Sequence, residues 1–182
     1  ADEAGIDTIL VGDSLNMVML GHSSTYSLTM DETVHHCKAV AQGVERAFMV
    51  GDLPFMSYQA DVVEAVRNAG RLMKEGKMDA VKLEGGQRMV PQVKAIVAAG
   101  IPVLGHIGLT PQSLSQLGGY RIQGKTTESA MTLFEDALAL QEAGCFALVI
   151  ESVPQPVASE ITKRLAIPTI GIGAGSGCDG QV

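Results

Sequence analysis

The amino-acid sequence predicts an α/β fold, a (β/α)8 TIM barrel of which this chain supplies about six of the eight βα units. Two observations support this prediction. Six short apolar runs rich in β-branched residues alternate with longer stretches whose apolar residues recur at helical spacing. Every run also ends at polar residues or glycine, and in such barrels the active site is assembled at the carboxyl ends of several strands at once.

Aliphatic and β-branched residues dominate each apolar run, which is typical of parallel strands buried on both faces. The expected strands are TILVGDS near residues 8–12, AFMVGDLP near 47–51, AVKLEGG near 80–84, PVLGHIG near 102–106, ALVIESVP near 146–151 and PTIGIGAG near 168–172.

Helices are expected at residues 30–42, 59–75, 87–99, 127–143 and 155–165. Glycine follows four of them, where a left-handed residue commonly ends a helix. These glycines are Gly43, Gly76, Gly100 and Gly144. The longest irregular stretch, residues 107–126, is expected to form a lid or binding loop.

The polar residues at the strand ends favour a barrel over an open doubly wound sheet. An open sheet concentrates its site at one switch point, whereas five of these six runs end at polar or charged side chains. A complete barrel takes eight strands and typically about 250 residues. We therefore expect residues 1–182 to form one incomplete barrel domain that lacks the first and eighth strands.

Composition argues against a nucleic-acid-binding protein and against a membrane-spanning protein. The net charge is −7 and the 13 Lys and Arg residues are scattered, which argues against a nucleic-acid partner. The absence of an apolar stretch of about 18 residues argues against a membrane span. Cys37, Cys145 and Cys178 have no metal-ligand spacing, which suits a reducing compartment. We expect inert thiols at Cys37 and Cys145, whereas Cys178, in a glycine-rich tail, could be exposed and reactive.

Asp13 and Asp52 each follow Val-Gly at a strand end, and a barrel would bring them together. Two carboxylates at one barrel mouth suggest Mg²⁺, which commonly takes one or two protein carboxylates and fills its shell with water and substrate oxygens. The alternative is that each Asp binds backbone N–H groups of its own loop. Ser14 could offer its hydroxyl to the same ligand or be a turn residue.

Lys82 and Glu84 end the third expected strand. They could form an ion pair with each other, which would satisfy a costly buried charge without any substrate. In the functional alternative, Lys82 holds a substrate carboxylate while Glu84 supports the water shell of the metal.

His106 and Glu151 end two further strands. A single histidine is often a satisfied core residue, but its position at a strand end favours a role in the site. Glu151 ends the most apolar strand, where partial desolvation favours a general base over a helix cap. The glycine-rich GIGAGSG could cradle a phosphate or let the backbone approach a planar ligand.

These segments resemble the ketopantoate hydroxymethyltransferase family over essentially the whole chain. The resemblance rests on VGDSLNMVMLGHSST, VGDLPFMSY, AVKLEGG, GHIGLTPQS with LGGYRIQG, VIESVP and IPTIGIGAG, in the order and spacing of the family. It implies a barrel of the phosphoenolpyruvate/pyruvate-like type. One departure is Ser152, where many relatives carry Cys.

The resemblance implies a role for each candidate residue. Asp13 and Asp52 match Mg²⁺ ligands in contact with substrate, and Glu84 matches a residue in the outer shell of the metal. The positions that hold the 2-oxo acid are matched by Ser14, Lys82 and His106. Glu151 matches the proposed base.

The implied reaction transfers a hydroxymethyl group from 5,10-methylenetetrahydrofolate to 3-methyl-2-oxobutanoate and gives 2-dehydropantoate, for pantothenate and coenzyme A biosynthesis. Mg²⁺ chelated by the 2-oxo acid would acidify the adjacent C–H, Glu151 would remove the proton, and the enolate would attack the folate methylene group. The family also implies a cytoplasmic homo-oligomer, commonly a decamer, with a 2-oxo acid and a folate as its small-molecule partners.

Two alternatives stay open. The chain could be another Mg²⁺ barrel acting on 2-oxo acids, of the phosphoenolpyruvate mutase and isocitrate lyase superfamily. Those enzymes use a catalytic Cys loop, for which residues 107–126 contain no cysteine. It could also be a non-catalytic barrel fragment that serves only as a scaffold for oligomers.

Overall fold

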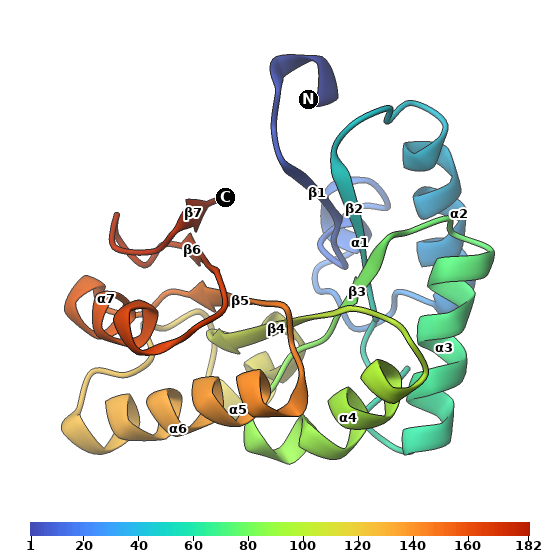
Figure 1. Ribbon diagram of the computed structural model, residues 1–182. Helices are drawn as coiled ribbons and strands as arrows, with labels where there is room; N and C mark the ends of the chain where they lie inside the picture. Colours follow the sequence, from blue (N-terminus) through green and yellow to red (C-terminus); the bar gives the residue numbers. More distant parts are fainter. The chain divides into compact units, whose positions relative to one another are not determined.

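The computed structural model describes residues 1–182 and divides them into two compact units (Figure 1). Unit 1 comprises residues 1–83 and 95–102, and unit 2 comprises residues 84–94 and 103–182. Helix α4 (Val90–Ala98) contributes residues to both. No helix is both long enough and apolar enough to cross a bilayer.

Unit 1 contains three parallel strands, β1 (Thr8–Val11), β2 (Phe48–Asp52) and β3 (Ala80–Lys82). Its helices are the short η1 (Asp2–Ala4) and α1 (Leu15–Val18) and the longer α2 (Met30–Ala41) and α3 (Val62–Lys74). Helix α2 packs against β1 and β2, and α3 packs against β3. Leu53, Tyr58 and Leu72 are fully buried in this unit, and burial of each such side chain contributes about 1.5–3 kcal/mol.

Polar side chains define where the two long helices of unit 1 begin. Thr29 and Glu32 form a reciprocal capping box at the start of α2, and Asp61 accepts the N–H groups of Val63 and Glu64 at the start of α3. Such caps satisfy backbone donors that have no partner within the helix.

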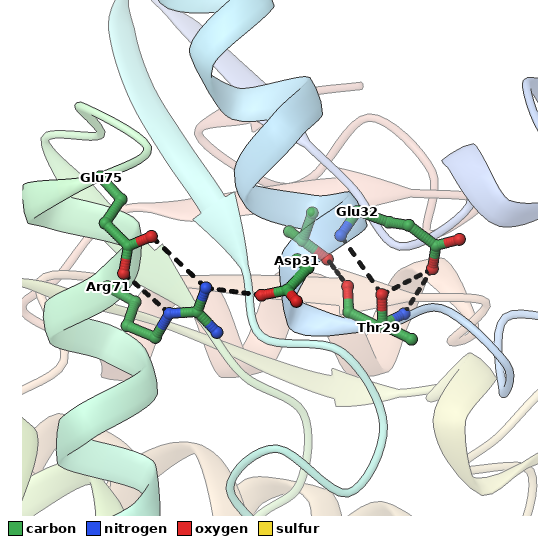
Figure 2. A network of polar contacts seen from close by, with 6 residues as sticks. Thr29, Asp31, Glu32, Arg71 and Glu75 are labelled. Carbon is green, nitrogen blue, oxygen red and sulfur yellow. Dashed lines mark hydrogen bonds and ion pairs between the residues drawn. The ribbon is translucent and has the colours of Figure 1, made fainter.

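Figure 2 shows the capping box of α2 beside a bridge between the helices. Arg71 on α3 lies 2.6 Å from Asp31 on α2 and 2.8 Å from Glu75. The hydrogen bonds from Arg71 lower the pKa of Glu75 and those at Thr29 lower that of Glu32. These contacts are exposed, so each fixes geometry more than it adds stability.

Unit 2 contains four parallel strands in chain order, β4 (Val103–Gly108), β5 (Ala147–Glu151), β6 (Thr169–Ile172) and β7 (Gly180–Gln181). Its helices are η2 (Gln87–Met89), η3 (Pro111–Ser113), α5 (Leu114–Leu117), α6 (Thr127–Ala143) and α7 (Gln155–Arg164). Helix α6 packs against β4, η2 and α7. Fully buried Leu140, Leu148, Ile150 and Ile161 form the centre of its core.

The six predicted strands and five predicted helices are confirmed, and strand β7 is an addition that the sequence did not predict. The prediction of about six βα units is thus confirmed, and β7 adds a short seventh strand in which Gly180 and Gln181 pair with Ile170 and Gly171. Residues 107–126 also hold more structure than expected, since β4 extends to Gly108 and η3 and α5 follow it. The single-domain interpretation stays a prediction.

The prediction of left-handed glycines after four helices is half right. Gly100 and Gly144 have φ values of 84° and 104°, but Gly43 and Gly76 are not left-handed, and after α3 it is Lys77 that takes a φ of 59°. Gly76 meets a different need. A Cβ atom there would lie 2.6 Å from the carbonyl oxygen of Leu72 and 3.0 Å from the Cβ of Cys37.

Candidate active site

Three buried charged residues lie at the carboxyl ends of the strands of unit 1. The Nζ of Lys82 lies 2.8 Å from both carboxylate oxygens of Asp52. The backbone N–H of Asp13 donates to the same carboxylate at 3.0 Å. Asp13, Asp52 and Lys82 are 4%, 1% and 3% exposed, so all three are buried.

Strand register explains this arrangement. Asp52 is the last residue of β2 and pairs with Lys82, the last residue of β3, while Asp13 lies two residues beyond the end of β1. Gly51, just before Asp52, leaves no room for a side chain, because a Cβ atom there would lie 2.9 Å from the Cγ of Met78. A small residue at this position lets β2 pack closely enough to place Asp52 inside.

The buried cluster has two carboxylates and one ammonium group, and so carries an excess negative charge when all three are ionised. Its effect reaches Cys37, whose pKa is raised to about 12 by burial and by the nearby Asp52 carboxylate. That thiol is therefore protonated at neutral pH, as expected for an inert cysteine.

This charge and donor set fit Mg²⁺. Carboxylate oxygens are the ligands that a hard divalent cation prefers, and two of them are as many as Mg²⁺ commonly takes from a protein. No group of three or more His, Cys, Asp or Glu side chains is arranged as a metal site. A cation held by Asp13 and Asp52 would thus take its other ligands from water and substrate. Ser14 is exposed next to Asp13, and its side chain makes no capping hydrogen bond to α1.

A histidine lies between two carboxylates at the carboxyl ends of the strands of unit 2. The Nδ1 of His106 is 3.5 Å from an oxygen of Glu84, and its Nε2 is 3.2 Å from an oxygen of Glu151. The second oxygen of Glu84 accepts the backbone N–H of Gln112 at 3.0 Å. The side chain of Glu151 is 17% exposed, against 2–3% for Glu84 and His106, so Glu151 is the member that a substrate can reach.

The backbone around Glu151 is held on both sides. In the register of β4 and β5, His106 is opposite Val149 and Gly108 is opposite Glu151, so the side chains of His106 and Glu151 share a face. The carbonyl of Glu151 accepts the N–H of Leu109 at 2.8 Å. A Cβ atom at Gly108 would lie only 2.2 Å from that carbonyl oxygen, which makes glycine necessary there.

Ser152, the residue after β5, has a backbone conformation that residues other than glycine seldom adopt. Its φ is 50°, in the left-handed region. Two hydrogen bonds of 2.8 Å hold this residue in place. The N–H of Ser152 donates to the carbonyl of Ile172, and the carbonyl of Ser152 accepts the N–H of Gln123. Backbone strain of this kind is often found at functional sites, where the surroundings over-determine it.

The structure thus places the predicted residues in two clusters, Asp13, Asp52 and Lys82 in unit 1 and Glu84, His106 and Glu151 in unit 2. Lys82 forms an ion pair with Asp52, a pairing that was not predicted from the sequence. Sequence reasoning also missed the contact of Glu84 with Gln112, because a backbone donor leaves no signal in residue types. The metal and substrate roles stay predictions.

Glycines of the GIGAGSG segment lie against helix α7. A Cβ atom at Gly175 would lie 2.6 Å from the Cβ of Gln155, and one at Gly177 would lie 1.8 Å from the Oγ of Ser159. Close approach of this segment to α7 therefore accounts for two of its glycines.

Solved structures show the class of fold. Phosphonopyruvate hydrolase in complex with oxalate and Mg²⁺ aligns with a TM-score of 0.69 at 14% identity, over 93% of this chain and 60% of that chain. A second structure of phosphonopyruvate hydrolase aligns with a TM-score of 0.68 over the same shares. At this identity the likeness shows the fold alone, which is the α/β barrel class of the phosphoenolpyruvate/pyruvate-like type.

Curated relatives named 3-methyl-2-oxobutanoate hydroxymethyltransferase are much more similar. That of Syntrophobacter fumaroxidans is 61% identical over 182 residues, which are 100% of this chain and 64% of the relative. That of Moorella thermoacetica is 63% identical over 182 residues, 100% of this chain and 68% of the relative. The chain spans 59–68% of the length of these and the Nitratidesulfovibrio vulgaris relatives. The model of the family matches residues 1–182, and the chain belongs to the ketopantoate hydroxymethyltransferase family.

Proposed function

We propose that the protein transfers a hydroxymethyl group from 5,10-methylenetetrahydrofolate to 3-methyl-2-oxobutanoate, with release of tetrahydrofolate and 2-dehydropantoate. The observation that carries this proposal is the 61–63% identity, over the whole chain, to relatives that bear the name of that activity. Water is also consumed, because the folate methylene group brings carbon and hydrogen but no oxygen. The cytoplasmic location and the homo-oligomeric assembly belong to the same proposal.

In unit 1, Asp13 and Asp52 would hold Mg²⁺, and Ser14 and Lys82 would contact the 2-oxo acid. When bound, Mg²⁺ supplies Lewis acidity toward the keto group and so weakens the adjacent C–H bond. Lys82 keeps the Asp52 carboxylate ionised and oriented, since both of its oxygens lie 2.8 Å from the ammonium nitrogen. The positive charge of Lys82 also favours a substrate carboxylate nearby.

In unit 2, Glu151 would remove the proton from C3 of the 2-oxo acid. Its carboxylate is partly exposed and lies 3.2 Å from Nε2 of His106. The Nδ1 of His106 lies 3.5 Å from Glu84, and Glu84 accepts the backbone N–H of Gln112 at 3.0 Å. The carbon nucleophile formed at C3 then bonds to the folate methylene carbon, both C–N bonds of that carbon break, the two folate nitrogens each take up a proton, and water supplies the hydroxyl oxygen of 2-dehydropantoate.

Exchange of the C3 proton with solvent tests the role of Glu151 without the folate. In deuterated water with Mg²⁺, Glu151→Gln should slow this exchange by about 10²-fold or more, the usual scale for a general base. Binding of 3-methyl-2-oxobutanoate, measured by calorimetry, should be nearly unchanged. Exchange at the parental rate in Glu151→Gln would assign the proton to another group, with Glu84 as the next candidate.

Glu142→Gln, at an exposed position of α6, is the matched control and should exchange at the parental rate. The same substitutions at the aligned positions of the Moorella thermoacetica relative provide the experiment in a longer chain.

A further inference from the structure

We propose that the loop tip Tyr120–Arg121–Ile122 binds the folate co-substrate, with the pterin ring on Tyr120 and Ile122 and the glutamate tail at Arg121. The inference rests on the proposed function and assigns the co-substrate to residues of unit 2. The pterin ring of the co-substrate needs a planar, apolar surface, and the two charged clusters do not provide one.

The loop is anchored beside the proposed base. The N–H of Gln123, which directly follows the tip, donates to the carbonyl of Ser152 at 2.8 Å, and Ser152 directly follows Glu151. The next residue, Gly124, lies close to α6, because a Cβ atom there would lie 2.7 Å from the Cδ1 of Leu133. The exit of the loop is therefore fixed relative to Glu151.

The entry of the loop is also held. Helix α5 ends at Gly118 with a φ of 72°, and the N–H of Gly119 donates to the carbonyl of Leu114 at 3.0 Å. Just before α5, the guanidinium of Arg88 donates to Ser113 at 3.1 Å. Glycines with positive φ, Gly118, Gly119 and Gly124, thus lie on both sides of the tip. Hydrogen bonds and packing hold both ends of the loop, whereas the tip itself is exposed.

The tip exposes side chains that are usually buried. Tyr120 is 64% exposed and Ile122 is 51% exposed, and no other aromatic side chain of the chain is as exposed as Tyr120. Seven Phe and Tyr residues and no Trp occur in 182 residues, so an exposed ring is scarce here. An exposed aromatic next to an apolar side chain is a surface on which a planar heterocycle can stack.

Charge favours an anionic ligand at the same place. Residues 107–127 contain Arg121 and Lys125 and no Asp or Glu, in a chain of net charge −7. The glutamate tail of a folate carries carboxylates, and its pterin is planar and bicyclic. The loop tip offers a matching cation and a matching flat surface.

The reaction requires the co-substrate to bind near this position. The folate methylene carbon must come within about 3–3.5 Å of the C3 carbon that Glu151 deprotonates. The pterin that carries this carbon must therefore lie beside Glu151. In unit 2, the tip is the exposed aromatic segment that a hydrogen bond ties to the residue following Glu151.

Calorimetric titration of the intact protein with tetrahydrofolate, in the presence of 3-methyl-2-oxobutanoate and Mg²⁺, tests the inference without turnover. Tyr120→Ala should weaken tetrahydrofolate binding about 5- to 100-fold, the range for stacking on an aromatic side chain. Tyr120→Phe should keep most of the affinity. Because Tyr120 is exposed, Tyr120→Ala should melt at the parental temperature.

Arg121→Gln should weaken tetrahydrofolate binding about 3- to 10-fold at low salt and less at high salt, as expected for an exposed charge contact. It should leave binding of tetrahydropteroate, which lacks the glutamate, unchanged. Met131→Ala and Lys163→Gln remove an exposed apolar and an exposed cationic side chain elsewhere in unit 2 and are the matched controls.

The outcomes distinguish a failure of the folate-site assignment from a failure of the proposed function. If the parental protein binds tetrahydrofolate and Tyr120→Ala and Arg121→Gln bind it equally well, the loop tip is not the folate site, while the proposed function stands. If the parental protein and a longer relative both fail to bind tetrahydrofolate, the proposed function fails with it. Losses as large in Met131→Ala as in Tyr120→Ala would also overturn the assignment.

Discussion

The ammonium group of Lys82 lies at equal distance, 2.8 Å, from both carboxylate oxygens of Asp52, and both side chains are almost wholly buried. Adjacent parallel strands provide this pairing, since the two residues are opposite each other at the ends of β2 and β3. Removal of either partner would take a close counter-charge away from a buried group, which is far more costly than loss of an exposed ion pair.

Lys82→Met and Asp52→Asn should each lower the free energy of unfolding by about 3–5 kcal/mol, the usual cost of breaking a buried pair from one side. Urea denaturation measures this change in the free energy of unfolding. The double variant should be more stable than the sum of the single effects predicts, because it removes both members of the pair instead of leaving one without the other. Arg164→Met, which breaks an exposed pair with Glu160, is the control and should cost about 1 kcal/mol or less. Additive single effects would contradict the expected coupling.

Gly108→Ala should be destabilising and should slow C3 proton exchange. The glycine has a φ of 89°, and a Cβ atom there would lie 2.2 Å from the carbonyl oxygen of Glu151, so the base must move. Gly100→Ala is the matched control, because Gly100 has a φ of 84° but nothing lies within 4 Å of the added atom. Both variants share the backbone strain of about 1–3 kcal/mol. We expect only Gly108→Ala to impair exchange, and equal impairment would disprove the steric cause.

Substitutions of Ser152 should distinguish the effect of its backbone strain on stability from its effect on C3 proton exchange. Ser152→Gly removes a strained left-handed residue and should cost little stability or add up to about 1 kcal/mol. Ser152→Val should be destabilising, because β-branched residues seldom adopt the φ of 50° found there. We expect slower C3 exchange in Ser152→Val with a nearly unchanged affinity for the 2-oxo acid. Lys77→Gly, at a φ of 59°, is the control and should change stability without any change in exchange.

Stability should fall on acidification. The carboxyl groups of Asp2, Glu32 and Glu75 have pKa values below the ordinary 3.8 and 4.5, chiefly because backbone N–H groups or Arg71 donate hydrogen bonds to them. A depressed pKa in the folded state means that the contribution is complete above the unfolded value and is lost as pH falls through the folded value. Thermal melts at pH 6 to 3 should show the decline, and it should be shallower in Asp2→Asn. An identical slope in that variant would exclude Asp2 as a cause.

Stability should also fall at alkaline pH. Burial raises the pKa values of Cys37 and Cys145 from 9.0 to about 12. A raised pKa in the folded state means that the contribution of these thiols to stability is complete below the unfolded pKa of 9.0 and is lost as pH rises toward 12.

In the native protein at pH 8, a thiol reagent should modify the partly exposed Cys178 first. Rapid modification of three thiols would contradict the burial of Cys37 and Cys145.

The sequence predicted the strands well because hydrophobic burial imposes both their pattern and their polar ends. Asp52, Lys82 and Glu151 were each recognisable as a polar residue near the end of an apolar run. Strand β7 was not recognisable, since two residues paired through their backbone require no apolar run.

Partners within the site were less predictable than its members. Lys82 binds Asp52, which is thirty residues away in the chain, a pairing that the spacing of residue types does not suggest. Such a contact depends on strand register, which residue types alone do not determine. The contacts of Glu84 and Ser152 with backbone groups are invisible to sequence for the same reason.

The interleaving of the two units along the chain has a consequence for synthesis on the ribosome. Unit 1 needs residues 95–102, which follow the first stretch of unit 2, and the N–H of Val81 in β3 donates to the carbonyl of Pro102. The nascent chain therefore cannot finish unit 1 when Leu83 emerges and must wait until Pro102 has left the exit tunnel. During that interval β3 lacks this hydrogen bond, and a chaperone that shields it would act on a defined, short-lived intermediate.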